Sequence, residues 1–184
     1  MSASELLVRQ ERLQADARAF LAAHQVERRL AQAGRVLPVG SYVTGLMVWR
    51  DLDLCVDARG LGRAKAWELV RPLLVHADRA CYEHLEQPDD RRHYFVLQAE
   101  GWKLDLSLFT AGIPREVEVF QNELQRRLDD ETGLAILRLK ELWRLRPEYP
   151  EIVGGFEISQ AVLEGVRTPK ELEVSLRARG LLEA

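Results

Sequence analysis

Lysine is scarce in this sequence, because only four of its 26 basic residues are lysines: Lys65, Lys103, Lys140 and Lys170. No long basic tract is present, and 29 acidic residues bring the formal net charge to −3 at pH 7. Proteins that bind nucleic acid or anionic membranes through bulk charge usually carry a strongly basic surface. The charge balance therefore argues against a nucleic-acid partner and predicts no membrane partner.

Cysteine and long apolar runs are also rare. Cys55 and Cys81 are the two cysteines, and they lie too far apart for a CxxC motif or a disulfide framework. No stretch approaches the roughly 18 apolar residues of a membrane span. The N-terminal residues have charges where a signal peptide needs an apolar core. We expect a cytoplasmic protein.

The 184 residues are enough for one domain, or for one domain with a small appendage. Alternation of apolar and polar residues predicts strands at 35–39, 51–57, 81–87, 91–100 and 102–109. Recurrence at three- and four-residue steps predicts helices at 4–33, 62–77, 114–146 with a break near 129–133, 155–166, and from 169 onward. The order predicts an α+β fold: a small mixed sheet of four to five strands flanked by helices, with a C-terminal helical region. We divide the chain into an α/β domain, residues 1–110, and a helical region, residues 111–184.

Three aspartates stand out within the predicted strands. Asp51 and Asp53 are two residues apart, so a strand points both carboxylates to one face, with Cα atoms roughly 6.5 to 7 Å apart. Asp105 interrupts an otherwise apolar strand on its polar face. If the two strands are neighbours, all three carboxylates meet, as a site for a pair of Mg²⁺ ions requires. A solvated strand edge would explain the first pair alone.

A Gly40-Ser41 pair precedes these aspartates and follows the short strand 35–39. Gly-Ser after a strand, an Asp-x-Asp pair ten residues later, and an apolar-Asp-apolar strand further on resemble the nucleotidyltransferase superfamily typified by DNA polymerase beta. Its minimal nucleotidyltransferases and the aminoglycoside- and lincosamide-modifying nucleotidyltransferases are similar in size. The resemblance covers about residues 35–110 and leaves the helical region outside it.

The resemblance implies roles for these residues. Gly40 and Ser41 would hold the phosphates of a nucleoside triphosphate such as ATP, and Asp51 and Asp53 would bind two Mg²⁺ ions. Asp105 would join them as a third metal ligand and help to deprotonate the attacking hydroxyl. All three aspartates are thus the expected catalytic and metal-binding residues.

Three further residues are nucleotide-binding candidates. Tyr42 and Arg50 lie in the segment between Gly40 and Asp51, where loop residues often meet ligands, although turn packing explains Tyr42 equally well. Lys103 shares a strand face with Asp105 and could contact phosphate, although surface lysines are common. The four histidines show no metal-ligand spacing and are expected to serve packing or the surface.

These features predict a Mg²⁺-dependent nucleotidyltransferase that moves a nucleoside monophosphate, AMP from ATP, to a hydroxyl of a small molecule. Two alternatives stay open: the same chemistry on a protein or tRNA acceptor, and a nucleotide-binding protein without catalysis. Because the helical segments carry many apolar positions, a homodimer is a further expectation.

Overall fold

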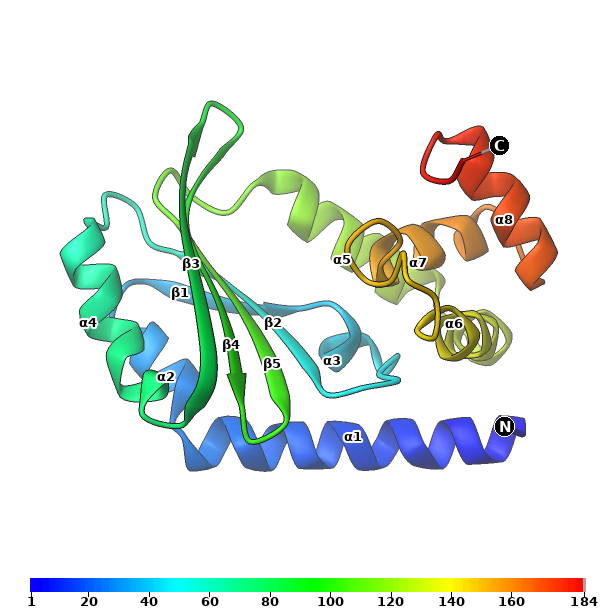
Figure 1. Cartoon of the computed structure of the whole chain (residues 1–184), viewed down its shortest axis with the longest axis horizontal. Helices are drawn as coiled ribbons and strands as arrows, with labels where there is room; N and C mark the ends of the chain where they lie inside the picture. The colour runs from blue at the N-terminus through cyan, green and yellow to red at the C-terminus, as the bar shows by residue number, and fades with distance from the viewer. Residues whose placement is uncertain (184) are drawn as a thin grey trace.

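A computed structural model describes residues 1–183 and shows a five-stranded sheet with helices around it (Figure 1). The strands are β1 (Arg35–Val39), β2 (Asp51–Asp57), β3 (Ala77–Gln87), β4 (Asp90–Ala99) and β5 (Trp102–Phe109). The helices before the last strand are α1 (Ala3–Ala23), α2 (Val26–Leu30), α3 (Ser41–Thr44) and α4 (Arg63–Leu74). The helices after it are α5 (Arg115–Arg127), α6 (Asp130–Trp143), α7 (Gly155–Leu163) and α8 (Pro169–Ala178). This is the predicted α+β arrangement.

The strand order β1-β2-β5-β4-β3 places the two aspartate-bearing strands side by side. β2 and β5 are the parallel pair, and the other neighbours are antiparallel. Asp53 lies directly opposite Asp105 in the register, and Asp51 lies opposite Lys103. β2 and β5 are therefore neighbours, which is the arrangement in which we expected the three aspartates to meet.

One face of the sheet is apolar and buried. Leu52, Leu54 and Val56 of β2 and the alternating leucines of β5 pack against α1, α2 and α4. Because side chains of a strand alternate between faces, the aspartates of β2 and β5 are left on the opposite face. The sheet thus has the hydrophobic core on one face and the three aspartates on the other.

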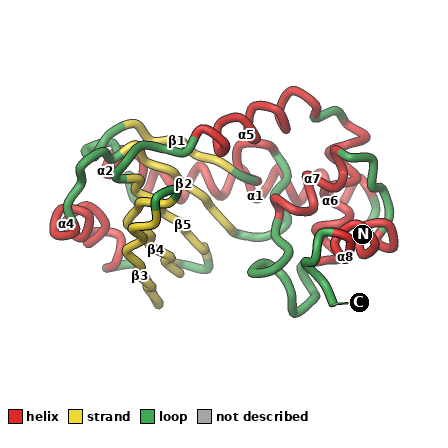
Figure 2. Tube along the Cα trace, turned by 90° about the horizontal axis from the view of Figure 1, so that it is seen from above, coloured by secondary structure: helices red, strands yellow, loops and turns green. Residues whose placement is uncertain are grey.

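A second apolar cluster lies among the C-terminal helices. α5, α6, α7 and α8 contribute most of it, and Figure 2 shows these helices gathered beside the sheet. Leu46 and Val48, which lie between α3 and β2, also pack into this cluster. The segment between the Gly-Ser pair and Asp51 therefore connects the sheet with the helical part.

The prediction of one continuous helix over 4–33 is wrong. α1 ends at Ala23, and α2 begins at Val26 after Gln25, whose φ of 50° is left-handed. The apolar spacing continues across this break because Val26 and Leu30 are also buried against the core, so periodicity alone does not reveal it.

Most other element predictions are close to the structure, but β3 begins at Ala77, four residues before the predicted strand, and the short helix α3 was not predicted. The expected break near 129–133 separates α5 from α6, where the Asp129 side chain accepts a hydrogen bond from the Thr132 amide as an N-cap. Thr168 likewise caps α8 in a reciprocal pair with Glu171. Within residues 1–183, no helix is both long and apolar enough to cross a membrane.

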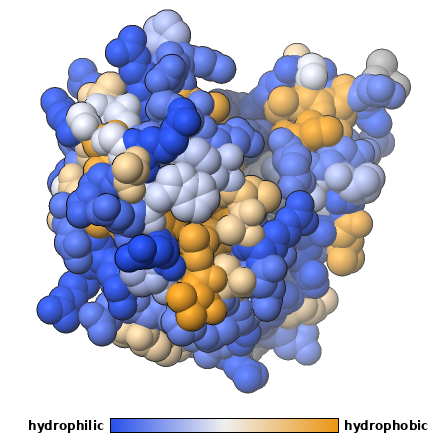
Figure 3. All heavy atoms as spheres, turned by 60° about the vertical axis from the view of Figure 1, so that its left-hand side comes forward, coloured by the Kyte–Doolittle hydropathy of each residue, from blue (hydrophilic) through white to orange (hydrophobic). Residues whose placement is uncertain are grey.

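Hydrophilic residues cover most of the face that α4 and β3 bring forward, around a limited apolar patch (Figure 3).

Candidate active site

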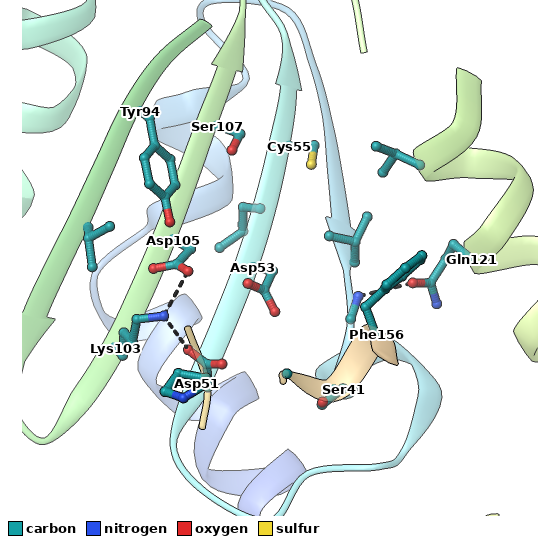
Figure 4. Close-up of a pocket in the computed structure, with 18 of the residues that line it drawn as sticks. Ser41, Asp51, Asp53, Cys55, Tyr94, Lys103, Asp105, Ser107, Gln121 and Phe156 are labelled. Atoms are coloured by element: carbon teal, nitrogen blue, oxygen red, sulfur yellow. Dashed lines mark hydrogen bonds and ion pairs between the residues drawn. The ribbon is translucent and has the colours of Figure 1, made fainter. Parts of the chain in front are cut away.

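The three predicted aspartates meet on the polar face of the sheet. Asp51 and Asp53 project from β2 and Asp105 from β5, as Figure 4 shows. One carboxylate oxygen from each lies within 4.8 Å of those of the other two. Three hard oxygen donors on rigid strands form a ligand set suited to Mg²⁺.

Burial makes the negative charge of this cluster costly. It is the main cause that raises the pKa of Asp51 to about 6 and that of Asp53 to about 8, and the neighbouring carboxylates raise both further. Asp51 Oδ1 and Asp105 Oδ1 are buried, and neither has a hydrogen-bond partner among residues 1–183. Carboxylate oxygens left in this state fit a bound divalent cation, which would neutralise the charge and supply the missing partner.

Lys103 is the nearest basic group to the cluster. Its Nζ donates a hydrogen bond of 2.8 Å to Asp105 Oδ2 and lies 3.7 Å from Asp51 Oδ1. These carboxylates outweigh the effect of burial and raise the pKa of Lys103 above its usual value. The Lys103 ammonium group therefore balances part of the negative charge of the aspartate cluster. It contacts two of the three aspartates, Asp51 and Asp105.

The Gly40-Ser41 turn lies against the same cluster. Gly40 has a φ of 71°, and a Cβ added there would lie 2.6 Å from Asp53 Oδ2. Only glycine accepts both the left-handed backbone and this close approach. The Gly40 amide donates a 3.0 Å hydrogen bond to Gln121 Oε1 of α5, so the turn is held between the sheet and the helical part.

Lys140 is a site residue that the sequence reasoning missed. It is 2% exposed on α6, and its Nζ donates hydrogen bonds to Ser41 Oγ and, at 2.8 Å, to the Leu46 carbonyl. Burial lowers the pKa of Lys140 to about 8, although Asp51 and Asp53 oppose this effect. The available signal was a lysine within the apolar positions of a helix, in a chain with only four lysines.

A cleft of about 980 Å³ opens above these residues. The polar face of the sheet forms one wall, and residues of α5 and of the segment 149–159 form the other. Phe120 and Phe156 form an aromatic pair on the helical wall, with ring centroids 4.4 Å apart, and the Phe156 residue is 52% exposed. The cleft therefore has the three carboxylates on its sheet wall and an accessible aromatic surface on its helical wall.

Further polar residues of the sheet line the cleft next to the aspartates. Tyr94, Ser107 and Cys55 face the cleft beside Asp105 and Asp53 (Figure 4). Burial raises the pKa of the Cys55 thiol to about 12 and also raises that of the Tyr94 phenol. Both groups are neutral at physiological pH, so Cys55 is not an activated nucleophile.

Two predicted nucleotide-binding residues lie outside the cleft. Tyr42 packs against the first core cluster and lines a separate hollow with residues of α1 and α2. Arg50 pairs with Asp16 at 3.2 Å and lies over the Trp102 ring. The chain turns at α3 directly after Ser41. The Tyr42 side chain therefore points away from the side of the sheet on which Ser41 lies. The structure thus brings together Gly40, Ser41, Lys103 and the three aspartates, without Tyr42 and Arg50.

Comparison with known proteins gives structural neighbours only. No protein-family model and no curated protein matches the sequence. The fold is similar to the Cid1 poly(U) polymerase with Mg and 3′-dATP bound, with a TM-score of 0.60 at 19% identity over 82% of this chain and 48% of that one. A cytoplasmic RNA terminal U-transferase gives 0.55 at 18% identity over 82% and 45%. The polymerase core of TRAMP, an RNA surveillance complex, gives 0.50 at 19% over 88% and 56%. The chain spans about half the length of these neighbours, and it shares their fold.

Proposed function

From the polymerase beta-like nucleotidyltransferase fold of this chain, we propose that it transfers a nucleoside monophosphate from a nucleoside triphosphate to a hydroxyl group. The observation that carries the proposal is the convergence of Asp51, Asp53 and Asp105 within 4.8 Å beside the Gly40-Ser41 turn. All three carboxylates are present, which favours catalysis over nucleotide binding alone.

The aspartates would hold two Mg²⁺ ions. When bound, the ions would lower the pKa of the acceptor hydroxyl and neutralise the charge on the leaving pyrophosphate. Asp51 and Asp53 would supply ligands from one strand, and Asp105 would supply the third from the neighbouring strand. The Asp105 carboxylate accepts the proton of the acceptor hydroxyl. The acceptor oxygen forms a bond to the α phosphorus, and the bond from that phosphorus to the β-phosphate oxygen breaks.

Residues around the Gly-Ser turn would bind the rest of the nucleotide. Ser41 and the backbone at Gly40 would contact the triphosphate, and Lys140 adds a buried positive charge behind Ser41. The exposed ring of Phe156 offers a surface on which a base can stack. We propose ATP as the donor, with the choice of base to be tested directly.

For the acceptor we propose a small molecule that carries a hydroxyl group. Outside the aspartate cluster, the charged residues that line the cleft are four acids and four bases: Glu83, Glu116, Glu151, Glu157, Arg79, Arg92, Lys103 and Lys140. Such a lining has no excess positive charge, whereas proteins that hold RNA neutralise its phosphates with lysine and arginine. The balance favours a neutral or cationic acceptor over a polyanion.

An RNA acceptor is the second candidate, because two of the structural neighbours are named for RNA polymers or RNA ends. The two candidates can be distinguished by measuring whether a small molecule or an RNA stimulates the release of pyrophosphate.

The test is calorimetry of ATP, GTP, CTP and UTP with and without Mg²⁺, followed by pyrophosphate release with small polyols, amino sugars, tRNA and an RNA oligonucleotide. Asp53→Asn should abolish Mg²⁺-dependent binding and transfer. Asp57→Asn is the matched control, because Asp57 lies on the same strand and pairs with Arg59 instead. Nucleotide binding that survives Asp53→Asn unchanged, or no binding by the wild type, would contradict the proposal.

A further inference from the structure

His24, His76 and Glu100 meet at one end of the sheet although the sequence separates them widely. His24 ends α1, His76 lies between α4 and β3, and Glu100 lies in the turn between β4 and β5. Figure 1 shows these three segments converging at the lower edge of the sheet. One potential ligand atom from each side chain lies within 4.8 Å of those of the other two.

The separations are close to those of a metal site. His24 Nε2 lies 3.3 Å from Glu100 Oε1, and His76 Nδ1 lies 3.8 Å from the same oxygen. Zinc bonds of about 2.0 to 2.1 Å in a tetrahedron keep neighbouring ligand atoms about 3.3 to 3.4 Å apart. The first contact already has this spacing, and the second, which is beyond hydrogen-bond distance, needs a shift of about half an ångström to reach it.

The donor set differs in chemistry from the aspartate cluster. Imidazole nitrogen suits Zn²⁺ and related transition metals, whereas all-oxygen sets suit Mg²⁺. We propose that His24, His76 and Glu100 form a second metal site that binds Zn²⁺. The ion has three protein ligands and a water molecule in its fourth position.

The surroundings fix two of these ligands and leave the site accessible. The His24 ring packs against Phe20 and against His76, with centroids 4.5 Å apart in both pairs. Glu100 has a φ of 52°, a conformation that a turn residue other than glycine or asparagine rarely adopts. The side chains of His76 and Glu100 are 46% and 55% exposed, so an ion can enter from solvent.

A bound ion would join the end of α1, the start of β3 and the turn that leads into β5. Trp102 follows this turn and packs on Phe20, with ring centroids 5.7 Å apart. Lys103 and Asp105 of the candidate active site come next on the same strand. The second site would therefore hold the strand that carries Asp105 in place without taking part in transfer.

The experiment is calorimetric titration of Zn²⁺ into full-length protein that was stripped of metal and then equilibrated with excess Mg²⁺. Five proteins are compared: the wild type, the control His84→Gln, Asp51→Asn/Asp53→Asn, His76→Gln and Glu100→Asn. Asparagine accepts the left-handed turn conformation, so the last variant removes the carboxylate without disturbing the backbone. His84→Gln is the matched control, since His84 also faces a glutamate, Glu86, at 3.5 Å but belongs to no three-residue ligand cluster within residues 1–183.

We expect one equivalent of Zn²⁺ to bind wild type, the double aspartate variant and His84→Gln alike. His76→Gln and Glu100→Asn should each bind at least tenfold more weakly, and Zn²⁺ should raise the melting temperature of wild type but not of these two variants. Co²⁺ should give the absorption of a tetrahedral nitrogen and oxygen site in the same three proteins. Zn²⁺ binding that disappears with the aspartates, persists in His76→Gln, or is missing from wild type would overturn the proposal and leave only a histidine–glutamate ion pair.

Discussion

Lys140 and Ser41 are joined by a hydrogen bond between Nζ and Oγ, although 99 positions separate them in the sequence. The bond connects the last turn of α6 to the turn that approaches Asp53. A second hydrogen bond, to the Leu46 carbonyl, fixes the same ammonium group from the other side. The position of the Gly40-Ser41 turn therefore depends on a residue of the helical part.

Replacing this lysine tests that dependence. In Lys140→Met the buried charge and both hydrogen bonds disappear, while the methionine fills a similar volume. Because a buried ammonium is costly, we expect the free energy of unfolding to change by only about 1 kcal/mol. The affinity for MgATP should fall about tenfold or more, since Ser41 loses its anchor and the phosphates lose a nearby charge.

Lys170→Met is the control for this prediction, because Lys170 is an exposed lysine on α8. It should leave both stability and nucleotide affinity unchanged. Equal nucleotide affinity in Lys140→Met and wild type, measured by calorimetry, would show that the ammonium group does not serve the nucleotide.

Gly40 has a ψ of −148° together with its positive φ, a backbone conformation open essentially to glycine alone, so replacing it adds backbone strain as well as steric conflict. Gly40 and Gly60 have φ values of 71° and 73°, but only Gly40 has an atom, Asp53 Oδ2, in the path of an added Cβ. Gly60→Ala should cost about 1 to 2 kcal/mol of left-handed strain. Gly40→Ala should cost more, and it should also displace Asp53 and weaken Mn²⁺ binding at least tenfold, as measured by electron paramagnetic resonance. Equal effects in the two variants would show that the Asp53 contact is unimportant.

Lys103 would compete with a divalent cation for the carboxylates of Asp51 and Asp105, which it contacts. Removing its charge in Lys103→Gln leaves Asp51 and Asp105 without a counter-ion, so the metal-free protein should lose about 1 to 3 kcal/mol of stability. Mg²⁺ affinity should rise about tenfold, because a positive charge some 4 Å away no longer repels the ion. Calorimetry measures this, with Lys65→Gln, an exposed pair with Glu68, as control. A drop in Mg²⁺ affinity would mean that Lys103 orients the carboxylates.

The raised pKa of Asp53 predicts the pH dependence of stability. An aspartate titrates near 3.8 in the unfolded chain and at about 8 here, so the folded protein binds its proton more tightly. The resulting stability is fully present below about pH 4 and is lost as pH rises toward 8. Relative to Asp53→Asn, metal-free wild type should lose a few kcal/mol over this window, and saturating Mg²⁺ should remove most of that difference. Urea unfolding at several pH values measures it.

The predictions from sequence succeeded where a local pattern determines the geometry. Alternation in 51–57 and 102–109 identified the strand faces, and these placed Asp51, Asp53 and Asp105 together once β2 and β5 proved to be neighbours. The position of Gly40 and Ser41 after a strand is also a short-range signal, and the structure places this turn against Asp53.

Residues that reach the site from distant segments carried no such signal. Gln121 and Lys140 lie on helices whose spacing predicts only which face is buried, and the packing of the helical part against the Gly-Ser turn brings them to the site. His24, His76 and Glu100 are assembled in the same way from three segments. Tyr42 and Arg50 show the converse, because closeness in sequence to Gly40 and Asp51 did not place them in the cleft.

The long helix α1 contacts both the sheet and the C-terminal helical part of the molecule. At about 1.5 Å per residue its 21 residues span some 30 Å, with Ala17, Phe20 and Leu21 in the sheet core. Arg9 near its other end pairs with Glu141 of α6 at 2.8 Å and donates to the Val48 carbonyl. Helix α1 thus ties the sheet to α6, and moving α6 away from the sheet would break the Arg9–Glu141 ion pair.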